Sequence, residues 1–188
     1  MAMAISVPLY TVADLEKFPD DGNRYELLDG VLLVTPAPAA IHQLVASRIQ
    51  GDLFVALQKP RHAHVVGPGA VVRYPRTQLQ PDILVYPSRF TPRTDWRGIT
   101  EHWLAVEVLS RSSRVYDREF KRDAYFALGV QQVWLVDWRE ALVEVCEAPG
   151  KSRRVRDVIE WHVPAVDVDV VVDLAEIFAG IDDVTSRG

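Results

Sequence analysis

The stretch "HWLAVEVLSRSS", residues 102–113, is a run of apolar residues interrupted by one carboxylate. A run that is apolar at successive positions is typical of a strand in the middle of a sheet that is covered on both faces. Glu107 stands inside this run, between Val106 and Val108. An ionised carboxylate buried there costs several kcal/mol unless a cation or hydrogen bonds compensate it. The sequence therefore predicts a central strand and a partner for Glu107.

A second carboxylate opens another apolar run. Asp82 follows Pro81 and precedes "ILVY", residues 83–86. An aspartate at the start of a strand can simply be a turn residue. If the two strands are neighbours, however, Asp82 and Glu107 lie close together, and a divalent cation between them would offset their repulsion. Oxygen ligands of this kind suit Mg²⁺ or Mn²⁺.

The third candidate residue, Lys121, follows the strand in a predicted helix. Its long side chain could extend over the strand ends toward Glu107. A metal site beside a fixed positive charge suits cleavage of a phosphodiester: the metal polarises the phosphate and lowers the pKa of an attacking water, and the lysine stabilises charge in the transition state. The alternative is a surface ion pair with Asp117, four residues earlier on the same helix face.

The other elements follow from apolar periodicity and turn residues. Helices are predicted at 11–19, 41–57, 115–129 and 173–180, and a hairpin over 24–36 that turns at Asp29-Gly30. Strands are predicted at 69–74, 81–86, 103–109, 132–138 and 141–147, and a basic turn at 151–157. This mixed order favours an α/β sandwich, a mixed β-sheet flanked by helices.

Composition is that of an ordinary globular protein. The chain has 188 residues, of which 48% are hydrophobic and 25% charged, so we expect one domain with a sizeable core. A single cysteine and the absence of a signal-peptide pattern predict a cytoplasmic protein. Aspartates interrupt the most apolar stretch near the C-terminus, residues 165–178, and no segment has the uninterrupted apolar length of a membrane span. The net charge of -5 argues mildly against non-specific coating of nucleic acid.

Basic residues nevertheless gather near the candidate carboxylates. Positive charge there could steer a polyanion to the site, and solvated turns and helix faces are an equally weighted alternative. No helix-turn-helix or zinc finger is evident, so the sequence does not predict base-specific reading of DNA. The three groups are Arg89, Arg93 and Arg97; Arg111, Arg114, Arg118, Lys121 and Arg122; and Lys151, Arg153, Arg154 and Arg156.

Four segments taken in order resemble the Uma-two family of endonucleases, within the PD-(D/E)XK restriction-endonuclease-like superfamily. They are "YELLDG" (25–30), "QPDILVY" (80–86), "LAVEVLSRSS" (104–113) and "YDREFKRDAYFALGVQQVWLVD" (116–137), with an early helix that contains His42 between the first two. The resemblance extends from Tyr25 to Val145 and is most specific between Glu107 and Trp134. It implies a restriction-endonuclease-like α/β core and DNA hydrolysis that depends on a divalent metal.

Carried over by position, the resemblance makes Asp82 and Glu107 metal ligands and Lys121 the catalytic lysine. Glu26, in "YELLDG", matches an acidic position of the family and is a candidate further ligand. Where the superfamily signature expects lysine, two residues after Glu107, this chain has Leu109; the family's lysine lies on the following helix, where Lys121 stands. His42 is assigned to the first turn of its helix rather than to the chemistry.

Two other functions remain open at this point. A catalytically silent member would keep the fold as a nucleic-acid-binding or dimerisation module, with Trp96, Trp138 and Trp161 exposed at an interface. A metal-dependent hydrolase of small phosphorylated molecules could use the same three side chains. A homodimer is also open, because nucleases of this fold often need two subunits to cut two strands.

Overall fold

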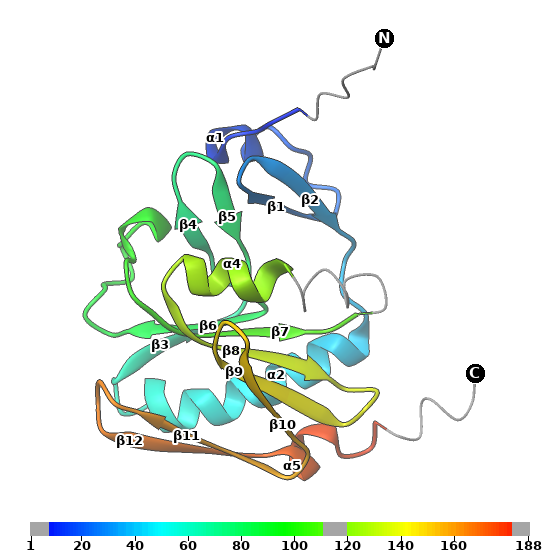
Figure 1. Cartoon of the computed structure of the whole chain (residues 1–188), viewed down its shortest axis with the longest axis vertical. Coiled ribbons are helices and arrows are strands. Elements are labelled where there is room, and N and C mark those ends of the chain that lie inside the picture. The colour runs from blue at the N-terminus through cyan, green and yellow to red at the C-terminus, as the bar shows by residue number, and fades with distance from the viewer. Residues whose placement is uncertain (1–7, 111–119, 182–188) are drawn as a thin grey trace.

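A mixed sheet with strand order β10-β9-β8-β7-β6-β3 crosses the molecule (Figure 1). The computed structural model describes residues 8–110 and 120–181. Neighbouring strands of the sheet are antiparallel, except that β7 and β8 run parallel. The strands are β3 (Ala63–Val66), β6 (Ile83–Pro87), β7 (His102–Val108), β8 (Val130–Asp137), β9 (Leu142–Ala148) and β10 (Lys151–Val155).

A second sheet, of order β2-β1-β5-β4, lies above the first in the view of Figure 1. The predicted hairpin forms its edge, and both turn residues, Asp29 and Gly30, have positive φ, at 50° and 87°. Asparagine, aspartate and glycine tolerate this conformation best, which is why the dipeptide marks the turn. The strands are β1 (Arg24–Leu28), β2 (Val31–Thr35), β4 (Val71–Arg73) and β5 (Thr77–Leu79).

Helices cover both faces of the large sheet. Helix α2 (Ala40–Leu53), which continues as a π-helical turn over Phe54–Gln58, packs on one face with the hairpin β11 (Val158–Val163) and β12 (Val168–Asp173). Helix α4 (Arg122–Ala127) packs on the other face through Tyr125. The remaining helices are α1 (Val12–Leu15), the 3-10 turn η2 (Trp96–Gly98) and α5 (Leu174–Phe178).

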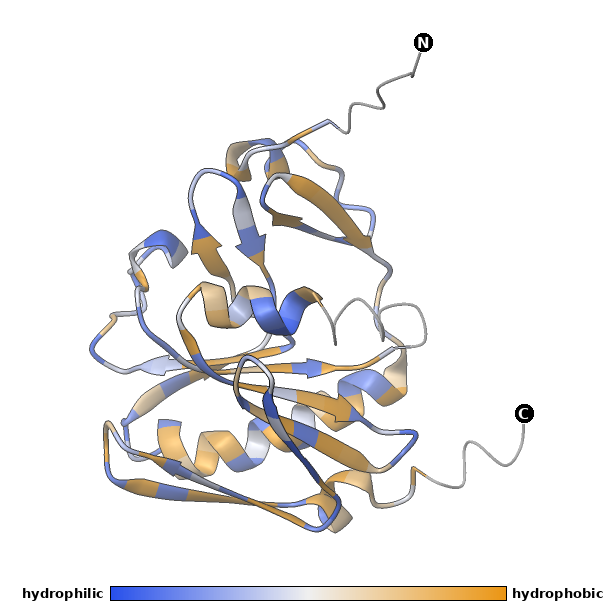
Figure 2. Ribbon diagram, in the orientation of Figure 1, coloured by the Kyte–Doolittle hydropathy of each residue, from blue (hydrophilic) through white to orange (hydrophobic). Residues whose placement is uncertain are grey.

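Strand β7 is buried at every position, as expected for a strand covered on both faces. Hydrophobic residues, orange in Figure 2, dominate this part of the sheet. Its alternate residues enter two different clusters: Leu104 and Val106 pack toward α2, and Ala105 packs toward α4. Glu107 therefore lies on the α4 face of an apolar sheet. No helix in the described ranges is both long and apolar enough to cross a membrane.

Several predicted elements differ from the structure. Residues 151–155, interpreted as a basic turn, form β10, whose exposed charges are those of an edge strand held by pairing with β9. Trp138 and Trp161 are buried rather than exposed; Trp161 packs edge-on against Trp134, with ring centroids 5.7 Å apart. Strands β3, β5, β11 and β12 were not predicted. Of the helix predicted at 115–129, residues 115–119 lie outside the described residues.

His102, the first residue of β7, is a buried imidazole whose ring nitrogens have no hydrogen-bond partner among the described residues. Burial, opposed in part by Glu101, lowers the pKa of His102 from 6.5 to about 4. As the pH falls, His102 is therefore protonated in the unfolded chain before it is protonated in the folded protein. The free energy of unfolding will fall by about 3 kcal/mol as the pH drops from 6.5 to 4. Urea denaturation at several pH values will show a smaller loss in His102→Leu; equal losses in both proteins would contradict this account.

Candidate active site

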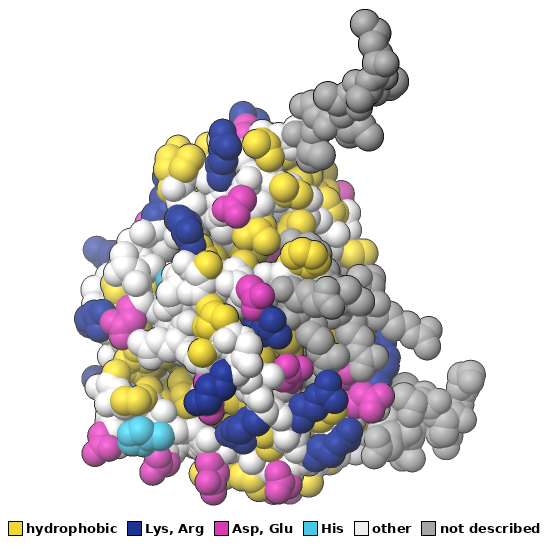
Figure 3. Space-filling model, viewed as in Figure 1, with side chains coloured by type: hydrophobic (Ala, Val, Ile, Leu, Met, Phe, Trp, Pro, Cys, Tyr) yellow, Lys and Arg dark blue, Asp and Glu magenta, His cyan; other side chains and the backbone are white. Residues whose placement is uncertain are grey.

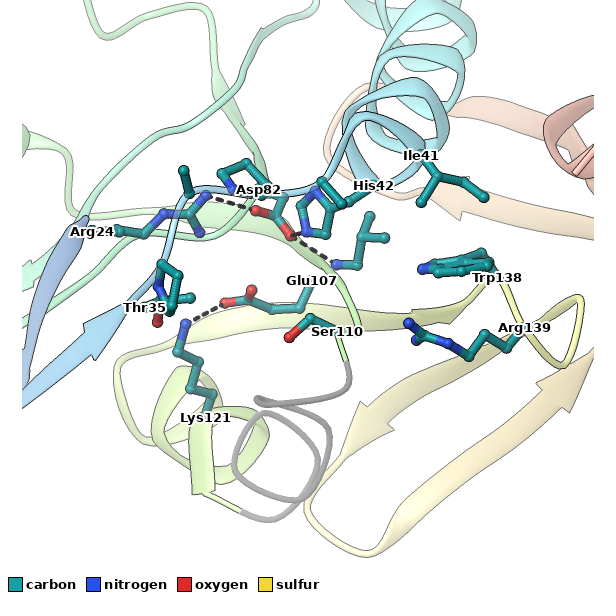
Figure 4. A pocket seen from close by; sticks show the side chains of 15 residues that line it. Arg24, Thr35, Ile41, His42, Asp82, Glu107, Ser110, Lys121, Trp138 and Arg139 are labelled. Atoms are coloured by element: carbon teal, nitrogen blue, oxygen red, sulfur yellow. Dashed lines mark hydrogen bonds and ion pairs between the residues drawn. The ribbon is translucent and has the colours of Figure 1, made fainter. Parts of the chain in front are cut away.

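The pairing of β6 with β7 brings the two predicted carboxylates together. The strands are antiparallel, and Ile83 lies opposite Val106. Asp82 lies immediately before β6, beside the end of β7, where the Val108 backbone nitrogen donates a hydrogen bond to it. Both side chains line a cavity of about 240 Å³, together with Lys121 (Figure 4). The rest of the lining comes from Arg24, Thr35, Pro36, Ala37, Pro38, Ala39, Ile41, His42, Val108, Ser110, Trp138 and Arg139.

Asp82 is buried and is held by three donors. Its Oδ1 accepts a hydrogen bond from Arg24 Nη2 at 2.9 Å, and its Oδ2 accepts one from the Val108 backbone nitrogen at 2.8 Å. His42 Nε2 lies 3.1 Å from the same Oδ2. Burial alone would raise the pKa of Asp82, but His42, Arg24 and the Val108 N–H together lower it below the ordinary value. The carboxyl group is therefore ionised at neutral pH.

Glu107 has the cationic partner that its burial requires. Its Oε1 accepts hydrogen bonds from Tyr125 Oη at 2.6 Å and from Lys121 Nζ at 3.2 Å. Lys121 is itself buried, and its Nζ lies 2.8 Å from Glu26 Oε2. The other oxygen of Glu26 accepts a hydrogen bond from the Gln80 backbone nitrogen. One ammonium group thus lies between two buried carboxylates.

The structure places Glu26 behind the cavity rather than in it. Its side chain is fully buried and contacts Lys121, whereas Asp82, Glu107 and Lys121 all line the cavity. Of the four residues named from the sequence, three therefore share one space. Glu26 is linked to that space through the ammonium group of Lys121.

Sequence reasoning missed three residues that hold these side chains. Arg24 lies two positions before Glu26 in β1, so strand alternation places the two on one face. Tyr125 lies four positions after Lys121, on the same side of the helix. His42 does lie in the first turn of α2, as assigned, but it also contacts Asp82. The spacings of two and four were present in the sequence, but the distance to each carboxylate was not.

A glycine is also needed next to Asp82. A Cβ atom placed on Gly67 would lie 2.6 Å from the backbone oxygen of Asp82, which is too close for any other residue without a shift of the backbone. The loop after β3 therefore approaches the start of β6 directly. A side chain at this position would require the backbone of one of these two segments to shift.

The donor chemistry of the site fits a hard divalent cation. Mg²⁺ is commonly held by one or two carboxylates, with water and substrate phosphate as its other ligands, and Asp82 and Glu107 supply two. Each carboxylate oxygen can accept more than one contact, so the present hydrogen bonds leave coordination capacity. No set of three or more His, Cys, Asp or Glu side chains within residues 8–110 and 120–181 forms a complete metal cage.

Many of the predicted basic residues are engaged with acids or rings. Arg89 pairs with Glu101, and Lys151 pairs with Glu147. On the face that carries α4, Lys and Arg side chains are interspersed with Asp and Glu (Figure 3). Arg111, Arg114 and Arg118 lie outside the described residues. The described residues of this face therefore carry mixed charge.

A family model described as "Uma2: Putative restriction endonuclease" matches residues 12–175. The chain belongs to the Uma2 family. The resemblance drawn from "YELLDG" and the later segments is therefore confirmed, and the Uma2 match extends beyond both of its ends. Asp82, Glu107 and Lys121 all fall within the matched residues of the Uma2 model.

A solved structure shares the fold of this Uma2 protein. It is described as a "putative nuclease belonging to DUF820 from Anabaena variabilis ATCC 29413". The TM-score is 0.73, and the match covers 90% of this chain and 97% of that chain, at 18% sequence identity. The restriction-endonuclease-like α/β fold predicted from the sequence is confirmed. No match was found among curated proteins.

Proposed function

We propose that this Uma2 protein is an endonuclease that hydrolyses DNA phosphodiester bonds with the help of Mg²⁺ or Mn²⁺. One observation carries the proposal: two buried carboxylates, Asp82 just before β6 and Glu107 in β7, line the same cavity as a buried lysine. Buried charges are costly, and ionisable groups gathered in one cavity are typical of functional sites. Membership of a family described as restriction endonucleases supports the same class of reaction.

Asp82 and Glu107 would hold the metal ion. When bound, the ion polarises the phosphate and lowers the pKa of an attacking water. Lys121 is the catalytic lysine: its fixed positive charge at the cavity stabilises negative charge that develops on the phosphate oxygens. Arg24 and His42 keep Asp82 ionised and in position. A nick needs one such site, and a double-strand break needs a second, which a homodimer would provide.

Glu26 and Tyr125 act on the site as positioning residues. Glu26 contacts the Lys121 ammonium from behind the cavity, and Tyr125 donates a hydrogen bond to Glu107. Glu26 and Tyr125 do not contact the substrate themselves. They hold Lys121 and Glu107, which do. A fixed charge needs little reorganisation during the reaction, which is why such supporting contacts contribute to rate.

Cleavage of supercoiled plasmid DNA tests the proposal. The wild-type protein will nick or linearise plasmid with Mg²⁺ or Mn²⁺ but not with EDTA, and Asp82→Asn will reduce the rate by about 10²-fold or more. Asp167→Asn is the matched control, because that side chain is 96% exposed and lies outside the cavity.

Three results would count against this assignment. Equal cleavage by wild type and Asp82→Asn would show that Asp82 is not a metal ligand. Failure to cleave any form of DNA with either ion would favour a silent nucleic-acid-binding or dimerisation module. Hydrolysis of a chromogenic phosphodiester without cleavage of DNA would indicate a small phosphorylated substrate instead.

A further inference from the structure

Arg139 lies beside the cavity in a position that the proposed chemistry does not explain. It belongs to the turn between β8 and β9, and its guanidinium group stacks over the indole of Trp138, 4.0 Å from the ring centroid. Both residues line the cavity of Asp82 and Glu107. Figure 4 shows them on the side opposite Arg24.

The charge of Arg139 is available to a ligand, unlike that of the other cations of the cavity. Arg24 is paired with Asp82, and Lys121 contacts Glu26 and Glu107. Within the described ranges Arg139 forms no ion pair, and its side chain is exposed. The neighbouring acid, Glu140, is engaged by Arg156.

Stacking prepares this guanidinium group for an anion. The indole ring supports one flat face of Arg139 and leaves the N–H groups at its edge free to donate. Those donors match the paired oxygens of a phosphate group. Burial of Trp138 beneath the arginine fixes the platform, so less side-chain freedom is lost when a ligand binds.

The rest of the cavity suits the flanking part of a nucleotide. Apolar residues of the segment between β2 and α2 line it: Pro36, Ala37 and Pro38. Such a surface accepts a sugar or base, whereas the carboxylates would repel a phosphate that arrives without a metal ion. The first turn of α2, which also lines the cavity, contains no acidic residue to compete with a phosphate.

We infer that Arg139, stacked on Trp138, is a binding residue for a phosphate of the nucleic-acid backbone next to the one that is cleaved. The inference deepens the proposed function and rests on it, because the ligand is a segment of the same substrate. Arg139 donates to the non-bridging oxygens of that phosphate and holds the strand across the carboxylates. It contributes to binding and register, not to the bond-breaking step.

Binding of a labelled DNA duplex, measured by fluorescence anisotropy at several salt concentrations in EDTA and again in Mn²⁺, tests this role. Arg139→Ala will weaken binding about tenfold and reduce the slope of log Kd against log salt by about one. Arg139→Lys will keep the slope but bind more weakly, because lysine lacks the planar fork. Arg76→Ala is the matched control: Arg76 is exposed in the turn between β4 and β5 and does not line the cavity.

The kinetic readout separates this role from a structural one. In cleavage assays Arg139→Ala will raise KM about tenfold and leave kcat within about threefold of wild type, because the contact is made equally in the ground and transition states. A fall in kcat with unchanged KM, or an unchanged affinity and salt slope, would overturn the inference while the nuclease proposal stands. If the wild type bound DNA without cleaving it, and Arg139→Ala bound DNA more weakly, the inference about Arg139 would be supported and the proposed hydrolysis refuted. A wild type that binds no DNA under either condition would overturn both.

Discussion

Glu107→Gln will lower kcat/KM for metal-dependent DNA cleavage by about 10³-fold, which corresponds to about 4 kcal/mol of transition-state stabilisation. Glutamine keeps the size of the side chain and an oxygen that can accept from Tyr125 and Lys121. It lacks the negative charge that a divalent ion requires. Single-turnover cleavage rates with Mg²⁺ measure the loss, and calorimetric titration with Mn²⁺ will show weaker ion binding by the variant.

The control for this experiment is Glu160→Gln. Glu160 is exposed on β11, outside the cavity, and the same change of charge there will leave both the rate and the ion affinity unchanged. If Glu107→Gln cleaved DNA within about threefold of the wild-type rate, Glu107 would not be a metal ligand. Its burial would then reflect structure alone.

Lys121→Met will destabilise the metal-free protein by about 3–5 kcal/mol. The ammonium group lies between Glu26 and Glu107, so its removal takes away the buried cation that both carboxylates contact. Urea denaturation in EDTA measures the effect. Millimolar Mn²⁺ will restore part of the lost stability if the ion supplies positive charge near Glu107.

A second substitution separates charge from packing. Lys121→Met combined with Glu26→Gln will be more stable than Lys121→Met alone, because one buried negative charge has been removed as well. Lys17→Met is the matched control: Lys17 forms an exposed pair with Asp14, and its loss will leave stability unchanged within error. If the double variant were less stable than Lys121→Met, the stability lost in Lys121→Met would be due to poor packing of methionine and not to the missing charge.

The central strand could be predicted from sequence because the evidence for it lies in consecutive residues. The apolar run around Glu107 has no polar face, so it identifies a buried strand without knowledge of its neighbours. The hairpin at Asp29-Gly30 is equally local, since the turn depends on the φ angles of two residues. The fold class follows from the order of such elements.

Elements without a periodic signal could not be predicted. Strands β3 and β5 are four and three residues long, too short for alternation to be distinguished from chance. Strand β10 carries four exposed polar residues because it is an edge strand held by β9 on one side only. Its hydrogen-bonding partner, rather than its composition, makes it a strand.

The partners of the site residues depend on distances that a sequence does not contain. A cation for Glu107 could be expected, because a buried carboxylate needs one. That Lys121 also contacts Glu26, and that Arg24 and His42 share Asp82, follows from the way β1 and α2 meet the large sheet. Arg139 was unremarkable as a turn residue until its stacking on Trp138 placed it beside the carboxylates.

The antiparallel pairing of Ile83 with Val106 sets the register of β6 against β7, on which the geometry of the candidate site depends. A slip of a single residue between β6 and β7 would move Asp82 away from the Val108 backbone nitrogen that it accepts from, and would turn the side chains of one strand to the other face of the sheet. A shifted register would therefore cost free energy in two ways: a carboxylate would be buried among aliphatic side chains, and a valine or leucine would lie against charged groups. The register that gathers the candidate site residues is therefore also the one that keeps the residues of β6 and β7 buried.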